Sequence, residues 1–133
     1  MKHDLFRYIK SICRIYKVKI RLRKGYGGEY WAGQIILGTS GSTSDVISTF
    51  CHELAHYKND IEGKYPIYHR VDSCKAVRRV GIRKYAKYAL KAEIQTEHEG
   101  KKLAKIWFPK HRYQIVYKNN AYYEGFMYGY YYP

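Results

Sequence analysis

The spacing of hydrophobic residues near the beginning of the chain is first helical and then strand-like. Over residues 3–16 the apolar side chains lie three or four positions apart, which predicts an α-helix with one buried face. Residues 17–23, KVKIRLR, alternate strictly between basic and aliphatic side chains, which predicts a β-strand with one buried face. Residues 29–37 are predicted to form a second strand or a pair of strands, with Gly33 as a bulge or turn. We therefore expect a helix that packs over a small sheet.

A helical period returns after a loop of glycine and serine at residues 38–42. Its apolar positions are Val46, Ile47, Phe50 and Leu54. Thr43 and Ser44 are candidate N-cap residues for this helix, and the carboxylate of Asp45 complements the positive end of the helix dipole. The helix is expected to end at Asn59 or Gly63.

The stretch 59–70 is polar and contains the helix breakers Gly63 and Pro66, so it is expected to be irregular. His69 lies in it. Because histidines in loops are usually solvated, exposure to solvent is the simple interpretation, and a role as a third histidine ligand is the alternative.

Helical composition dominates the chain after residue 70. Asp72 or Ser73 can cap a helix that is weakened at Gly81, and residues 82–107 read as one long helix. The last stretch, 113–133, is dense in tyrosine and begins with a strand-like run, so a hairpin there is one option and a disordered segment or one that lies in a groove are the others. Together these patterns predict an α+β fold.

The length and composition are those of one folded domain. A chain of 133 residues with 46% hydrophobic residues is expected to form a single domain, residues 1–133, with its own core. No apolar run approaches the ~20 residues that cross a membrane, and no signal peptide is recognisable, so we expect a cytoplasmic protein without a membrane partner. The cysteines Cys13, Cys51 and Cys74 match no zinc knuckle and are expected to be free thiols.

The formal net charge is +14, which favours anionic partners such as nucleic acid bound through a basic surface. The same charge would also be explained by solubility alone, with lysine and arginine side chains covering helix faces. Nucleic-acid binding is therefore expected only as an accessory property.

The predicted helix after residue 42 contains the pentapeptide His-Glu-Leu-Ala-His at residues 52–56. Residues four apart share a helix face, so His52 and His56 can direct both imidazoles at one metal ion. Glu53 is rotated by about 100° from His52 and lies beside that ion, where a general base must be to take a proton from a metal-activated water. The alternative is a chance match on a solvated helix face.

Two imidazoles leave a catalytic zinc site one protein ligand short. Glu93 is the preferred third ligand, because it lies mid-helix beside Ala89 and Ala92, whose small side chains let two helices approach closely. Glu97, one turn further along, is expected to accept a hydrogen bond from a ligand imidazole or to be the ligand itself. Glu99 is a further alternative for the third ligand.

The sequence HELAH followed by Glu93-Ile94-Gln95-Thr96-Glu97 resembles the gluzincin metallopeptidases, in which H-E-x-x-H is followed by a helix with E-x-x-x-D, E-x-x-x-N or a variant. The order of helix, strands, H-E-x-x-H helix and glutamate helix is similar to ImmA/IrrE-type peptidases and to minimal single-domain gluzincins. The resemblance covers about residues 3–109. It departs from the pattern at Glu97, where Asp or Asn is commoner, and in a long gap between His56 and Glu93.

The resemblance implies a zincin-like fold with Zn²⁺ held by His52, His56 and Glu93. It also implies that Glu53 is the general base and acid of an endopeptidase acting on peptide or protein substrates. The strand region 29–37 would bind the substrate backbone as an added strand. Residues 113–133 would then be a candidate autoinhibitory tail that blocks the cleft.

Two other classes of function compete with the peptidase. One is a basic nucleic-acid-binding protein whose metal is structural or absent, and the other is an interaction protein on a zincin-like scaffold without proteolytic activity. The carboxylate of Glu53 argues against the second of these, because a purely structural metal site needs no base.

Overall fold

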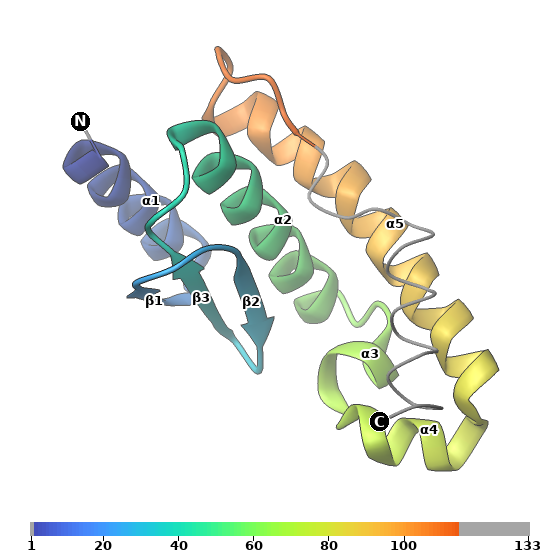
Figure 1. Ribbon diagram of the computed structural model, residues 1–133. Helices are drawn as coiled ribbons and strands as arrows, with labels where there is room; N and C mark the ends of the chain where they lie inside the picture. Colours follow the sequence, from blue (N-terminus) through green and yellow to red (C-terminus); the bar gives the residue numbers. More distant parts are fainter. Residues whose placement is uncertain (1, 115–133) are drawn as a thin grey trace.

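The structure, a computed structural model, describes residues 2–114 and has the predicted α+β composition (Figure 1). Its elements are α1 (Lys2–Tyr16), β1 (Lys19–Arg23), β2 (Gly28–Trp31), β3 (Gln34–Gly38), α2 (Thr43–Ile61), α3 (Pro66–Arg70), α4 (Ser73–Val80) and α5 (Ile82–Trp107). The first helix, the strand at 19–23 and the long last helix agree with the sequence-based expectation. The region 29–37 forms two strands, β2 and most of β3.

The three strands form a mixed sheet in the order β1-β3-β2. β1 runs parallel to β3, and β2 runs antiparallel to β3. The β2–β3 hairpin turns at Ala32 and Gly33, whose φ angles of 50° and 84° are both positive, as a two-residue hairpin turn with the right twist requires. The expected turn at Gly33 is confirmed, and β2 is left as an edge strand of the sheet.

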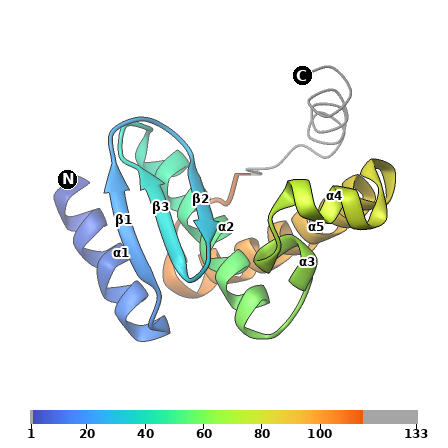
Figure 2. The same ribbon diagram turned by 90° about the horizontal axis from the view of Figure 1, so that it is seen from below.

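Helix α2 lies between the sheet and α5 (Figures 1 and 2). It packs against β2 and β3 on one side and along α5 on the other, while α1 packs against β1 and α2. Side chains from all these layers meet in one core, whose fully buried members include Ile9, Ile12, Ile35, Leu37, Phe50, Leu54 and Leu103. The alternation predicted for 17–23 is visible in β1, where Lys19, Arg21 and Arg23 are exposed.

The N-cap of α2 is Ser42, not Thr43 or Ser44. The backbone of Ser42 is extended, and its Oγ accepts a hydrogen bond of 3.1 Å from the amide of Asp45. A serine with this geometry satisfies one of the unpaired amides of the first turn, so the helix begins directly after it. At the other end, Gly63 follows the C-cap residue with a φ of 73°. Asn59 lies inside the helix instead of ending it, because its side chain donates to Thr96 of α5.

The region 59–70 is more regular than its composition suggested. α2 continues through Ile61, and after Gly63 the chain forms the short helix α3 with Pro66 in its first turn, where proline is well tolerated. The expectation of an irregular stretch is therefore wrong for most of these residues.

Helix α4 begins, and is separated from α5, at the residues that the sequence predicted. Asp72 caps α4 by accepting hydrogen bonds from the amides of Cys74 and Lys75, and Gly81 separates the two helices with a φ of 87°. Within residues 2–114, no helix is both long and apolar enough to span a membrane. Of the predicted strand at 113–117 and the tyrosine-rich tail, all but Tyr113 and Gln114 lie outside the described residues.

A close approach of β2 to α2 depends on Gly28. A Cβ at this position would lie 2.8 Å from Thr49 Cγ2, 3.1 Å from the Ile36 carbonyl oxygen and 3.2 Å from Glu53 Cγ. Since the β-branched Thr49 and the backbone of β3 have little freedom to move, we expect Gly28→Ala to lower the free energy of unfolding by about 1–3 kcal/mol. Urea denaturation measures this change, and Glu29→Ala, an exposed neighbour on the same strand, is the control. Equal stabilities for the two variants would contradict the packing of β2 on α2.

Candidate metal centre

Two histidines of α2 and one glutamate of α5 form a buried cluster. His52 and His56 are one turn apart on α2, and their ring centroids are 4.8 Å from each other. The carboxylate of Glu93 reaches both rings, with Oε1 2.8 Å from His56 Nε2 and Oε2 3.2 Å from His52 Nε2. The three residues are only 5–6% exposed. The interpretation of the pentapeptide as a solvated surface match is therefore excluded.

The helix interface explains how Glu93 reaches the histidines. Ala89 and Ala92, which flank Glu93 on α5, are completely buried, as the choice of Glu93 from the sequence assumed. Gly100 continues this run of small side chains, and a Cβ there would lie 3.3 Å from the Cα of His52. Small residues at the contact let the two helix axes come close enough for a glutamate side chain to span the gap.

The hydrogen bonds and charges of the cluster favour a positive charge between its three side chains. Burial acts to raise the pKa of Glu93, but the charge of His56 and hydrogen bonds from both imidazoles outweigh burial and hold that pKa below its usual range. Burial likewise disfavours a charged His52, yet its hydrogen bonds to Glu93 and Glu97 raise the pKa of His52 to about 10. A metal ligand must be a neutral imidazole, so a metal bound here would have to displace the proton from Nε2 of His52.

The second ring nitrogen of His52 is held by Glu97. Its Nδ1 lies 2.5 Å from Glu97 Oε1, and the same oxygen accepts a hydrogen bond of 3.1 Å from the Tyr113 hydroxyl. Once Nε2 has lost its proton, the Nδ1–H that donates to Glu97 keeps the lone pair of Nε2 available for a metal, and Nε2 is the atom that faces Glu93. Glu97 therefore lies behind the imidazole, on the side away from the other two members of the cluster.

His56 is oriented by a different set of neighbours. Its Nδ1 lies 3.1 Å from Nε2 of His69, whose own Nδ1 donates to the Lys64 carbonyl oxygen at 2.9 Å. Because His69 Nδ1 carries the proton, its Nε2 accepts from His56 Nδ1–H. The Thr96 hydroxyl donates to the Ala92 carbonyl and presents its oxygen 3.3 Å from the same Nδ1. This arrangement directs Nε2 of His56 at Glu93, where it could bind a metal in place of its contact with the carboxylate.

The buried position of His69 was not predicted from the sequence. It is buried, not solvated, because α3 folds back against α2 and carries its side chain behind His56. The Tyr68 hydroxyl, from the same helix, donates a hydrogen bond of 3.0 Å to Glu93 Oε1. The short helix is tied to α2 by Arg70, which pairs with Asp60 at 2.6 Å. The signal that could have indicated a structured segment is Pro66, which was interpreted as a helix breaker but begins α3.

Glu53 opens onto a cleft beside the cluster. The cleft has a volume of about 490 Å³ and is lined by residues 28–31 of β2 together with Glu53, His56, Tyr68 and Glu93. Burial raises the pKa of Glu53 above its usual range, and the positive charges of His56 and His52 oppose that effect. The carboxylate is thus next to the cluster without belonging to it.

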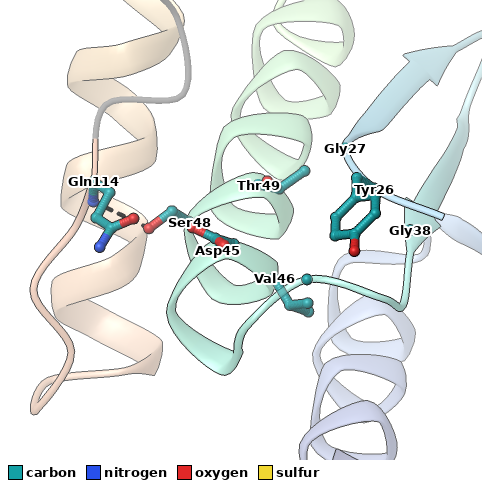
Figure 3. A pocket seen from close by; sticks show the side chains of 9 residues that line it. Tyr26, Gly27, Gly38, Asp45, Val46, Ser48, Thr49 and Gln114 are labelled. Carbon is teal, nitrogen blue, oxygen red and sulfur yellow. Dashed lines mark hydrogen bonds between the residues drawn. The ribbon is translucent and has the colours of Figure 1, made fainter.

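A second hollow lies further along α2, toward its N-terminal end (Figure 3). It has a volume of about 340 Å³, and Asp45 and Thr49 of α2 line it opposite Tyr26. On its far side the backbone amide of Gln114 donates a hydrogen bond of 3.0 Å to Ser48 Oγ. Asp45, Thr49 and Glu53 follow one another at intervals of four residues, so the hollow and the cleft share one face of α2.

The remaining candidates are not part of the cluster. Glu99 is half-buried and pairs with Lys58 at 3.7 Å and Lys102 at 3.6 Å. Cys51 is fully buried in the hydrophobic core, as expected from its position beside His52 on a different helix face. None of the three cysteines forms a disulfide within the part of the chain that the structure describes.

The donor set fits a zinc ion. Two imidazole nitrogens and one carboxylate oxygen are the protein ligands of one common kind of catalytic zinc site, with a fourth position left for water or substrate. Atoms that share a tetrahedral zinc lie about 3.4 Å apart, given metal–ligand bonds of about 2.1 Å. The candidate ligand atoms of His52, His56 and Glu93 all lie within 4.8 Å of one another. Small side-chain movements would therefore close the cluster around one ion.

Comparisons with protein-family models, with curated proteins and with solved structures found no match to this chain. What defines the site is thus its own geometry, a buried group of His52, His56 and Glu93 on two packed helices that could hold a metal ion. This arrangement is consistent with a metal site of the H-E-x-x-H type.

Glu97 orients the imidazole of His52, whereas Glu99 does not. Substitutions of Glu97 and of Glu99 should therefore have different effects on metal affinity. We expect Glu97→Ala to weaken zinc binding by about 10–100-fold, the usual cost of losing a carboxylate that holds a ligand imidazole. Glu99→Ala, two residues away on the same helix, should leave the affinity within about twofold. Competition titration with a chromogenic zinc chelator measures both. Equal affinities for the two variants would rule out the role of Glu97.

Proposed function

We propose that the protein is a zinc-dependent endopeptidase. The observation that carries this proposal is the position of Glu53, a buried carboxylate that lines the cleft next to the cluster of His52, His56 and Glu93. A structural metal site would be closed and would need no acid–base group at its open side. When bound, zinc supplies Lewis acidity, which polarises a peptide carbonyl and makes a water molecule acidic enough to lose its proton near neutral pH.

Glu53 supplies the proton transfers. Its carboxylate accepts a proton from the attacking water and then donates that proton to the nitrogen of the departing amine, so one group acts first as base and then as acid. Burial favours its protonated form, which matches the form it has between these two transfers. Because Glu53 follows His52 directly on α2, the helix fixes the carboxylate relative to the metal ligands.

The edge strand β2 offers a binding surface for the substrate backbone. The hairpin register pairs Trp31 with Gln34 and Glu29 with Ile36. In a two-residue hairpin these are the hydrogen-bonded pairs, so the backbone groups of Gly28 and Tyr30 point away from β3. Residues 28–31 also line the cleft, so an extended peptide could add to β2 as a further strand and pass the metal ligands.

The space available along α2 suits a peptide longer than a dipeptide. A chain paired with β2 would run from the cleft at Glu53 and His56 toward the hollow at Asp45 and Thr49. Both spaces lie between α2 and the chain segment that contains β2. An internal peptide bond of an extended substrate therefore fits this arrangement, which favours an endopeptidase.

Glu53→Gln separates proton transfer from metal binding. The amide keeps the size of the side chain but can no longer accept a proton, so we expect cleavage of quenched fluorescent casein to fall by about 10²–10⁴-fold. Zinc content, measured by inductively coupled plasma mass spectrometry, should remain at one ion per chain. Full activity in this variant, or no cleavage by the zinc-loaded wild-type protein, would contradict the proposal.

A further inference from the structure

The solvent face of α5 carries a continuous stripe of positive charge. At 100° per residue, its exposed basic side chains fall within an arc of about 100° around the helix axis. They are Arg83, Lys84, Lys87, Lys91, His98, Lys101, Lys102 and Lys105. The stripe spans about 33 Å along the helix at 1.5 Å per residue. The buried residues of α5, including Glu93, lie on the opposite side, against α2.

Negative charge is absent from this stripe. Glu93, Glu97 and Glu99 all lie outside its arc at helical spacing. Lys102 pairs with Glu99, and the other lysines and arginines of the stripe form no ion pair with any residue in 2–114. α4 packs beside the beginning of α5 and adds Lys75, Arg78 and Arg79, all exposed. A run of this length with one ion pair exceeds what an exposed helix needs for solubility, where both signs of charge are usually interspersed.

A groove lies at one end of the stripe. It has a volume of about 490 Å³ and runs between the last turns of α5 and the segment that follows the helix. Its basic lining residues are His98, Lys101, Lys105, His111 and Arg112. Lys101 and Lys105 of α5 and Arg112 of the following segment thus converge on one concave surface, which Glu97 also lines. An anionic group there would meet several donors at once.

The shape of this surface favours nucleic acid over a lipid bilayer. A helix that lies on a membrane exposes an apolar face beside its basic one, whereas the apolar face of α5 is buried against α2. A straight stripe of about 33 Å matches about one turn of duplex, over which phosphates recur at short intervals. Phosphate contacts of this kind fix position without reading sequence.

We infer that the basic stripe of α5, together with the groove formed by residues 98–112, binds the phosphate backbone of nucleic acids without sequence specificity. The stripe lies on the side of α5 opposite the buried residues that pack against α2, and the groove shares no lining residue with the cleft at Glu53, so a bound nucleic acid leaves that cleft open. This inference does not depend on peptidase activity.

The test compares two triple variants that remove equal charge. Lys87→Gln, Lys101→Gln and Lys105→Gln neutralise the stripe and groove, and glutamine keeps the helix propensity of lysine. Lys10→Gln, Lys19→Gln and Arg21→Gln neutralise three exposed cations of α1 and β1. Binding to a fluorescein-labelled 20-base-pair duplex of mixed sequence is followed by fluorescence anisotropy at several salt concentrations, for both variants and the wild-type chain.

We expect the stripe variant to bind the duplex at least tenfold more weakly at 50 mM salt. The slope of log affinity against log salt should become shallower by about 2.7, which corresponds to three lost phosphate contacts. The control variant should stay within threefold of the wild-type protein, and Glu53→Gln should bind like the wild type. Equal weakening of both triple variants, or binding to phosphatidylserine vesicles but not to the duplex, would overturn the inference.

Discussion

The contact between α2 and α5 is the constraint on which the site depends. The two helices are far apart in the sequence, and each alone carries an incomplete site, two imidazoles on one and a carboxylate on the other. Alanines at positions 89 and 92 and a glycine at 100 let the helices come close. The distances of 2.8 and 3.2 Å between Glu93 and the two histidines follow from that approach.

Several carboxylates of this basic protein are buried, whereas the cations of α5 lie on its surface. Glu53 and Glu93 are buried at the α2–α5 interface or at the cleft beside it, and Glu97 is mostly enclosed there, in spite of a net charge of +14. Buried carboxylates are costly unless cations or hydrogen bonds compensate them. Histidines supply that compensation in the structure, and a divalent ion would supply it more strongly. The outward face of the same helix α5 carries only positive charge along its stripe, so one helix separates two electrostatic environments.

Most of the fold could be predicted from the sequence because its hydrophobic residues recur at clear helical or strand spacing. The alternation at 17–23, the helical spacing after residue 42 and the long pattern at 82–107 each had one physical interpretation. Glu93 could be selected because small residues flank it in the sequence. His69 could not, since its burial depends on how α3 folds back over α2, which is a tertiary contact without a local pattern. Ser42 was missed as the N-cap because several hydroxyl residues stand in a row and only backbone geometry distinguishes them.

Extended X-ray absorption fine structure of the zinc-loaded protein tests the central claim most directly. We expect one zinc ion whose first shell contains two imidazole nitrogens at about 2.0–2.1 Å and carboxylate or water oxygen at about 2.0–2.2 Å. The characteristic outer-shell scattering of two imidazole rings should accompany it, and Glu93→Gln should alter the oxygen shell while keeping both rings. A sulfur shell at about 2.3 Å, or a shell of oxygens without imidazole scattering, would contradict a site built from His52, His56 and Glu93.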